Sequence, residues 1–369
     1  MFLNIKKSSY LLKSGYFSLP LHPQQIMLTA KTHRLSKPLR IKMNHILSIL
    51  LSVLLLLKCS STGDSSQPTP NQHATAQRIV PQFVGDSAYR AIEQQLAFGP
   101  RVPGSKAQEQ CAQWLQTELT RYGATVREMR STVTAYDGTT LPCINLVGSF
   151  HPELQNRILL IAHWDSRHVA DEDPDPSKRN QPVPAANDGA SGVGVLLEIA
   201  RQVGRKQPRF GIDIFLTDAE DYGAPDSWSG SHDEKFWALG TQQWCKQPHL
   251  AGYQANFGIL LDMVGAPDAT FYREYFSDQY ASDVVNLIWQ KAKQLGYQEL
   301  FIDQKGAGIT DDHLFVNRQR HIPTVDIIDT RLTGNGTFYP YWHTTDDTLD
   351  KLSVETLQKV GDVLMHIIY

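Results

Sequence analysis

From residue 157 onward the chain contains four short apolar runs, each bounded by polar residues. They cover residues 157–163 (RILLIAH), 210–217 (FGIDIFLT), 257–264 (FGILLDMV) and 323–328 (PTVDII). Continuous apolar runs of this length are typical of strands that are buried on both faces of a sheet. The pattern therefore predicts four buried strands.

Helical patterns separate these runs. Ser105 and Gln108 form a capping box for a helix that is predicted to reach Tyr122 and to end at Gly123. Further helices are predicted over residues 189–203 and 280–295 and from Ser353 onward, and β-rich stretches over 124–136 and 143–150. Strands that alternate with helices predict an α/β fold, with a mostly parallel mixed central sheet and helices on both faces.

The N-terminal part of the chain has a different pattern. Residues 46–57 (ILSILLSVLLLL) are almost wholly apolar, and four basic residues precede them: Arg34, Lys37, Arg40 and Lys42. The run is too short to cross a bilayer comfortably as a helix, and its length is typical of a signal peptide. Cys59 follows almost at once. This order resembles that of a bacterial lipoprotein, with lipid attached to Cys59.

A polar stretch rich in Ser, Thr and Pro follows Cys59 and cannot build a core. We therefore expect an export signal over residues 1–59, a flexible linker over 60–81 and a single catalytic domain over 82–369. Met43 is a candidate for the true start of the protein. The alternative to lipidation is a signal anchor that stays in the membrane.

Composition excludes some classes of protein. The 369 residues carry 35 Lys and Arg against 38 Asp and Glu, a net charge of −3, which disfavours a dedicated nucleic-acid binder. The chain has four cysteines and no CxxC pair, so a thiolate zinc site is not expected. Apart from Cys59 the cysteines are odd in number, and no disulfide is assigned: Cys111, Cys143 and Cys245.

Polar side chains that can bind metals gather where the predicted strands end. The first buried strand ends in His163 and Asp165, the second leads into Asp218-Ala219-Glu220-Asp221, and the third ends near Asp262. In open α/β sheets, ligands bind beyond the carboxyl ends of the strands. Taken alone, each of these residues has an ordinary structural explanation, such as a helix cap or a hydrogen-bonded histidine.

Together, these residues form a cluster of carboxylates. The repulsion among their negative charges would cost free energy unless a cation were bound. Asp188 precedes a predicted helix between the first two strands, and His343 lies near the C-terminus. Imidazole and carboxylate ligands are typical of catalytic zinc sites. We therefore expect a zinc centre at this edge of the sheet.

The ordered motifs resemble those of the zinc exopeptidase superfamily, and more closely those of its glutaminyl cyclase branch. The resemblance begins near residues 99–105 (GPRVPGS) and runs to the C-terminus. The segments that carry it are His163-Trp164-Asp165, Asn187-Asp188-Gly189-Ala190-Ser191, Asp218-Ala219-Glu220-Asp221, Leu261 to Pro267, Asp311-Asp312-His313 and Trp342-His343-Thr344. The implied fold is an aminopeptidase-like α/β/α sandwich.

The resemblance also implies roles for individual residues. Asp188, Asp221 and His343 would hold one zinc ion per chain, with Glu220 as general acid and base. Asp262 and Asp311 would form a carboxylate network, and three aromatic residues would line the substrate pocket: Trp342, Phe338 and Trp228. Animal glutaminyl cyclases have a glutamate where this chain has Asp221, and a histidine where it has Asp326.

The implied activity converts the N-terminal glutamine of peptides and proteins into pyroglutamate and releases ammonia. The alternative is an aminopeptidase with two zinc ions, in which His163 and Asp262 complete a second site around a bridging Asp188. A binding domain that has lost its chemistry is disfavoured, because no ligand is missing. We expect an exported protein in the periplasm or envelope, held at the membrane by lipid rather than by a spanning helix.

Overall fold

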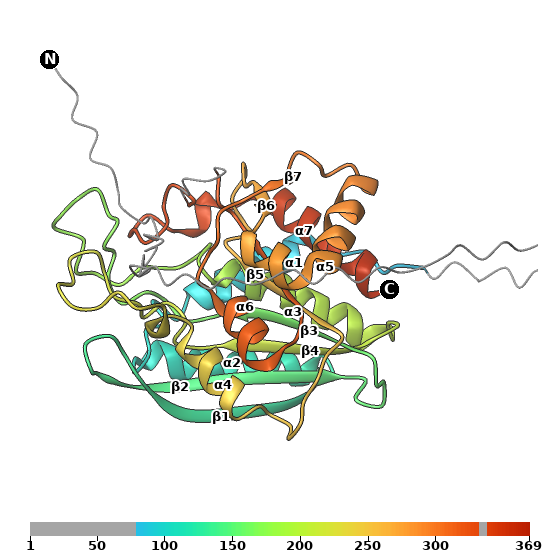
Figure 1. Ribbon diagram of the computed structural model, residues 1–369, viewed down its shortest axis with the longest axis horizontal. Helices are drawn as coiled ribbons and strands as arrows, with labels where there is room; N and C mark the ends of the chain where they lie inside the picture. Colours follow the sequence, from blue (N-terminus) through green and yellow to red (C-terminus); the bar gives the residue numbers. More distant parts are fainter. Residues whose placement is uncertain (1–78, 332–337) are drawn as a thin grey trace, which may run out of the picture. The chain divides into compact units, whose positions relative to one another are not determined.

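The computed structural model describes residues 79–331 and 338–369 (Figure 1). Residues Arg78–Tyr369 form one compact unit. The predicted export signal, with Met43 and Cys59, and all but the last residues of the predicted linker lie outside the described residues. Within the part of the chain that is described, none of the helices combines the length and apolar character needed to cross a membrane.

A six-stranded sheet runs through this unit in the order β1-β2-β4-β3-β5-β8. The strands are β1 (Thr125–Thr134), β2 (Thr140–Phe150), β3 (Arg157–His163), β4 (Gly211–Thr217), β5 (Phe257–Asp262) and β8 (Thr324–Ile328). The last four are parallel, and β1 and β2 form an antiparallel pair at one edge. The predicted mostly parallel, mixed sheet is confirmed.

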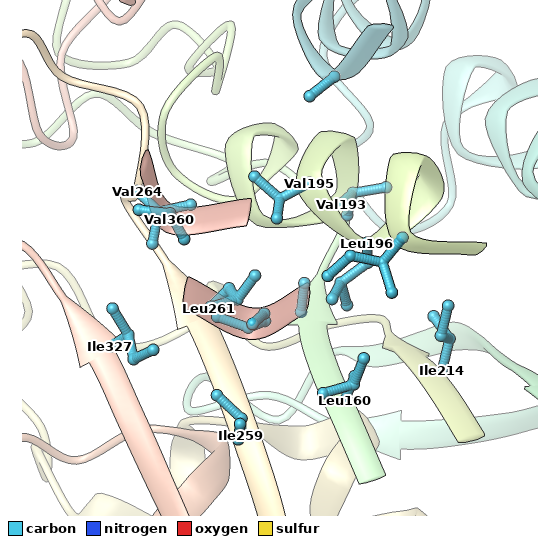
Figure 2. Close-up of a cluster of buried hydrophobic side chains, with 14 of the residues drawn as sticks. Leu160, Val193, Val195, Leu196, Ile214, Ile259, Leu261, Val264, Ile327 and Val360 are labelled. Atoms are coloured by element: carbon cyan, nitrogen blue, oxygen red, sulfur yellow. The ribbon is translucent and has the colours of Figure 1, made fainter. Parts of the chain in front are cut away.

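Helices cover both faces of the sheet (Figure 1). The larger core lies beneath α1 (Gly85–Leu96), α2 (Lys106–Arg121), α3 (Ala190–Arg205), α5 (Tyr275–Gln294) and α7 (Val354–Ile368). Figure 2 shows side chains of α3, such as Val195, above Leu160 of β3 and Leu261 of β5. Trp244 of α4 (Leu239–Lys246) packs on the opposite face, against Phe215. Burial on both faces explains why the strands read as continuous apolar runs.

Side chains that accept backbone hydrogen bonds mark the starts of α2 and α5. The hydroxyl of Ser105 accepts the N–H of Gln108 at 3.0 Å, as the capping box predicts. Helix α5 begins five residues before its predicted start at residue 280, because Glu274 accepts the N–H groups of the next turn. The backbone of Ala281 is not helical, which interrupts the periodicity on which the prediction depends. Helices α1 and α4 were not predicted.

Two glycines allow α3 to approach the strand ends. A Cβ at Gly192 would lie 2.2 Å from the carbonyl oxygen of Leu261, so only glycine lets α3 pack this closely on β5. At Gly189 a Cβ would lie 2.3 Å from Nε2 of His163. The loop before α3 therefore lies directly against the end of β3.

Candidate metal centre

Asp188, Asp221 and His343 converge although they come from distant parts of the chain. Asp188 precedes α3, Asp221 follows β4, and His343 lies in the loop that leads to α7. Nε2 of His343 is 3.2 Å from Oδ1 of Asp221 and 3.7 Å from Oδ2 of Asp188. Neighbouring ligand atoms of a tetrahedral zinc ion lie about 3.4 Å apart. The three buried side chains therefore have the chemistry and the spacing of a zinc site.

A second group of possible ligands shares Asp188 with the first. Nε2 of His163 lies 3.0 Å from Oδ1 of Asp188 and 3.2 Å from Oδ1 of Asp262. Asp188 thus turns one carboxylate oxygen toward His163 and the other toward His343. A carboxylate shared in this way can bridge two metal ions. The geometry is compatible with one cation or with two.

Glu220 is buried beside both groups and belongs to neither. Burial, followed by the negative charge of Asp311, raises the pKa of Glu220 well above its usual value. Burial and the charge of Asp188 likewise raise the pKa of Asp262 to about 7. A bound cation would offset this accumulation of negative charge. A carboxylate with a raised pKa is suited to accept and return a proton near neutral pH.

The end of β3 fixes the turn that carries Glu220 and Asp221. Asp165 accepts the backbone N–H of Glu220 and that of Asp221, each at 3.1 Å. Ala219 lies in the left-handed region with φ 52°, an uncommon conformation for a residue with a Cβ. Strained backbone of this kind is concentrated at functional sites. The tight turn aims Glu220 and its neighbour toward the strand ends.

A further buried acidic group lies around His313. Its Nε2 is 3.0 Å from Oε2 of Glu274, and its Nδ1 is 3.5 Å from Oδ2 of Asp326. Burial raises the pKa of Asp311, and burial together with the charge of Asp311 raises the pKa of Asp326 well above its usual value. Asp326, one of the two departures noted in the sequence, therefore belongs to this buried acidic network, and the charge of Asp262 also acts on it.

Aromatic rings flank His343. The ring of Trp342 stacks on it at a centroid distance of 3.6 Å, and Phe338 packs against Trp342 at 4.6 Å. Trp237 lies parallel to His343 at 6.3 Å. Trp228 instead meets Tyr136 edge-on at 5.0 Å. The structure therefore brings two of the three predicted pocket aromatics together beside the ligand set, and Trp237 joins them.

Comparison with known proteins places this geometry in a family. The model of peptidase family M28 matches residues 145–368, which include the candidate ligands and Glu220. The chain belongs to peptidase family M28. A glutaminyl cyclase from Bacteroides thetaiotaomicron is 47% identical, with a TM-score of 0.77, over 79% of this chain and 99% of that chain.

Two further solved structures are similar to this protein. A glutaminyl cyclase from Tannerella forsythia is 48% identical, with a TM-score of 0.75, over 78% of this chain and 99% of that chain. A leucine aminopeptidase precursor from B. thetaiotaomicron is 47% identical, with a TM-score of 0.76, over 79% of this chain and 98% of that chain. The protein is therefore a homologue of bacterial glutaminyl cyclases. It is an enzyme.

The sequence did not single out three residues that contact the candidate ligands or their backbone. Asp347 accepts the backbone N–H groups of Asn187 and Asp188. Arg167 contacts Asp221, and Asp171 contacts His343. All three lie in polar loops that read as solvated surface, and their proximity to the centre depends on how those loops fold. No local pattern predicts their roles.

Proposed function

We propose that this enzyme is a glutaminyl-peptide cyclotransferase, which closes an N-terminal glutamine into pyroglutamate and releases ammonia. Asp188, Asp221 and His343 would hold one zinc ion, which when bound supplies a Lewis acid for the γ-carbonyl oxygen of the substrate. The observation that carries the proposal is the position of Glu220, buried beside the ligands yet outside both groups. The similarity to bacterial glutaminyl cyclases supports it.

Glu220 serves both halves of the reaction in this proposal. Its carboxylate accepts a proton from the α-amine as the amine nitrogen forms a bond with the γ-carbon. The bond between the γ-carbon and the amide nitrogen then breaks, and Glu220 returns the proton to the departing ammonia. Burial and Asp311 raise the pKa of Glu220, which suits a group that must both take and give a proton.

The substrate carries its own nucleophile, so the pocket contributes mainly orientation. Trp342 and Phe338 form an apolar surface beside His343, where the methylene groups of glutamine would pack. Trp228, in contact with Tyr136, is a candidate for contact with residues that follow the glutamine. Asp262 and Asp311 would tune Glu220 through their charge.

The second candidate function is an aminopeptidase with two zinc ions. His163, Asp188 and Asp262 support it, because their ligand atoms lie within 4.8 Å of one another. A relative described as a leucine aminopeptidase precursor has the same level of identity. Proton transfer by Glu220 alone does not distinguish the two reactions, since hydrolysis also needs a general base.

Incubation of the purified protein with a glutamine-headed peptide separates the two functions. We expect mass spectrometry to show the loss of one ammonia molecule, and no such loss after chelation. The same peptide with an acetylated amine should remain unchanged, because its nitrogen cannot attack. Hydrolysis of a leucine arylamide without cyclisation of the peptide would instead establish the aminopeptidase.

We also propose that the enzyme is exported and attached to the membrane by lipid on Cys59. The apolar run and the cysteine that follows it support this. In the periplasm or envelope the enzyme would meet exported proteins whose new N-termini are glutamine. Cys59→Ser should move the enzyme from the membrane fraction to the soluble fraction. An unchanged membrane fraction would contradict lipid attachment.

A further inference from the structure

Arg167 is a buried arginine that contacts Asp221, one of the candidate metal ligands. Its Nη1 donates to Oδ1 of Asp221 at 3.1 Å and to the carbonyl oxygen of the same residue at 3.3 Å. Its Nε and Nη2 donate to the two carboxylate oxygens of Asp171, at 2.7 and 2.8 Å. One guanidinium therefore holds two carboxylates in a fixed relative position.

Asp171 extends this arrangement to a second ligand. Its Oδ1 lies 3.4 Å from Nδ1 of His343, an ion-pair distance at which the buried Nδ1 has no formed hydrogen bond among the described residues. A carboxylate at Nδ1 fixes the orientation of an imidazole and leaves Nε2 to face a metal ion. Nε2 of His343 is the atom that points toward Asp188 and Asp221. Through Asp171, Arg167 is therefore connected to His343 as well.

The position of Arg167 is itself fixed by its surroundings. Its guanidinium lies over the ring of Trp237 at 5.2 Å. Only 1% of the side chain is exposed to solvent. A buried, forked guanidinium loses little freedom when it forms paired hydrogen bonds, and it orients carboxylates more strictly than a lysine does. Arg167 thus provides a rigid support behind two ligands.

The two oxygens of Asp221 have different environments. Oδ1 accepts from Arg167 and is also the oxygen that lies 3.2 Å from Nε2 of His343, whereas Oδ2 is buried without a hydrogen-bond partner among the described residues. A buried carboxylate oxygen without a partner is costly unless a ligand satisfies it. Arg167 therefore holds in place the oxygen of Asp221 that faces His343, while a bound cation would satisfy Oδ2.

We propose that Arg167 is a positioning residue of the metal centre, which aims Asp221 directly and His343 through Asp171. This inference rests on the proposed metal site, but not on the identity of the substrate. Loss of Arg167 has two opposite effects on zinc affinity. The ligands lose their alignment, which weakens binding, and the centre gains negative charge, which strengthens it. The proposal is that alignment dominates.

Arg167→Lys separates the two effects, because lysine keeps the charge and lacks the fork. Arg167→Gln removes both the positive charge and the forked guanidinium. Arg157→Lys is the matched control, since Arg157 forms a similar bidentate pair with Asp213 at the opposite end of β3. Zinc dissociation constants come from competition with a chromophoric chelator. The absorption spectrum of the cobalt-substituted protein reports coordination, and circular dichroism reports folding.

We expect both Arg167 variants to bind zinc about 10- to 100-fold more weakly and to change the cobalt spectrum. Arg157→Lys should keep the zinc affinity and the spectrum of the unmodified protein. If Arg167→Lys keeps them as well, or if Arg167→Gln binds zinc more tightly, the inference is overturned while the proposed metal site stands. An unmodified protein that binds no zinc would overturn both.

Asp171→Ala provides an independent test that leaves Arg167 in place. It removes the contact with His343 together with the two hydrogen bonds from Arg167 to Asp171, but leaves Arg167 bonded to Asp221, and it lies in a loop rather than in the sheet. We expect zinc affinity to fall about 10-fold. An unchanged affinity would exclude the part of the proposal that concerns His343, even where the Arg167 variants do not fold.

Discussion

Asp188 and Asp347 are joined by a hydrogen bond in which the backbone N–H of Asp188 donates to Oδ2 of Asp347 over 3.2 Å. The carbonyl oxygen of Asp347 in turn accepts the N–H of Ala186. His343 lies four residues before Asp347. The contact therefore connects the loop that carries one candidate ligand to the loop that carries another.

Replacement of Asp347 tests this connection. Asp347→Ala should lower zinc affinity about 10- to 100-fold, because Asp188 and His343 are no longer held together. Asp346→Ala is the matched control, since the neighbouring carboxylate is about half exposed and pairs loosely with Lys178. Competition with a chelator measures the zinc affinity of both variants. Equal affinities for the two variants would exclude a role for Asp347 in the metal centre.

Glu220→Gln should lower the rate constant of cyclisation about 10²- to 10⁴-fold, because the amide cannot accept the proton of the amine. Zinc content should not change, since Glu220 belongs to neither ligand group. Glu355→Gln, at an exposed position on α7, should retain full activity. Metal analysis and single-turnover assays provide the two measurements. A fully active Glu220→Gln would refute the assignment of proton transfer to this residue.

Asp311→Asn should move the acid limb of the kcat profile to lower pH. Burial is the main reason for the raised pKa of Glu220, and the charge of Asp311 is the next. Without that charge the pKa of Glu220 falls, so its proton-accepting form persists at lower pH. The profile can be measured between about pH 5 and pH 9. A limb that stays in place, or moves to higher pH, would contradict the electrostatic coupling.

Trp342→Ala should raise KM for glutamine-headed peptides more than it changes kcat. The loss of an aromatic contact is worth about 0.5–1.5 kcal/mol, or about 2- to 13-fold. Trp342→Phe should retain most of the affinity. Trp244→Phe, which alters a ring packed on Phe215 in the other core, should leave KM unchanged. Equal KM values for Trp342→Ala and the unmodified enzyme would exclude Trp342 from the pocket.

The sequence predicted the buried strands, and placed several candidate site residues at their ends, because both follow from local pattern. Each buried strand reads as an apolar run, and His163, Glu220, Asp221 and Asp262 lie at or just beyond the ends of such runs. Parallel strands bring these ends to one edge of the sheet, so their convergence follows from the fold class. Asp188, before a predicted helix, and His343, near the C-terminus, were also singled out, but their roles as ligands came from the family resemblance.

The supporting residues were not predicted, for a physical reason. Arg167 precedes the acidic stretch Asp171 to Asp175, and Asp347 lies among threonines and aspartates, so both segments read as exposed loops. Their burial follows from long-range contacts, such as that between Arg167 and Asp221. The early start of α5 was missed for a related reason, because Glu274 begins the helix through its side chain while Ala281 interrupts its periodicity.

In the proposed mechanism, one zinc ion held by Asp188, Asp221 and His343 beside Glu220 suffices for cyclisation. The most direct test is a titration of the metal-free protein with zinc while pyroglutamate formation from a glutamine-headed peptide is followed by mass spectrometry. Activity should rise linearly and reach its plateau at one zinc ion per chain. A plateau only at two zinc ions, or no cyclisation at any loading, would contradict a mechanism with a single zinc ion.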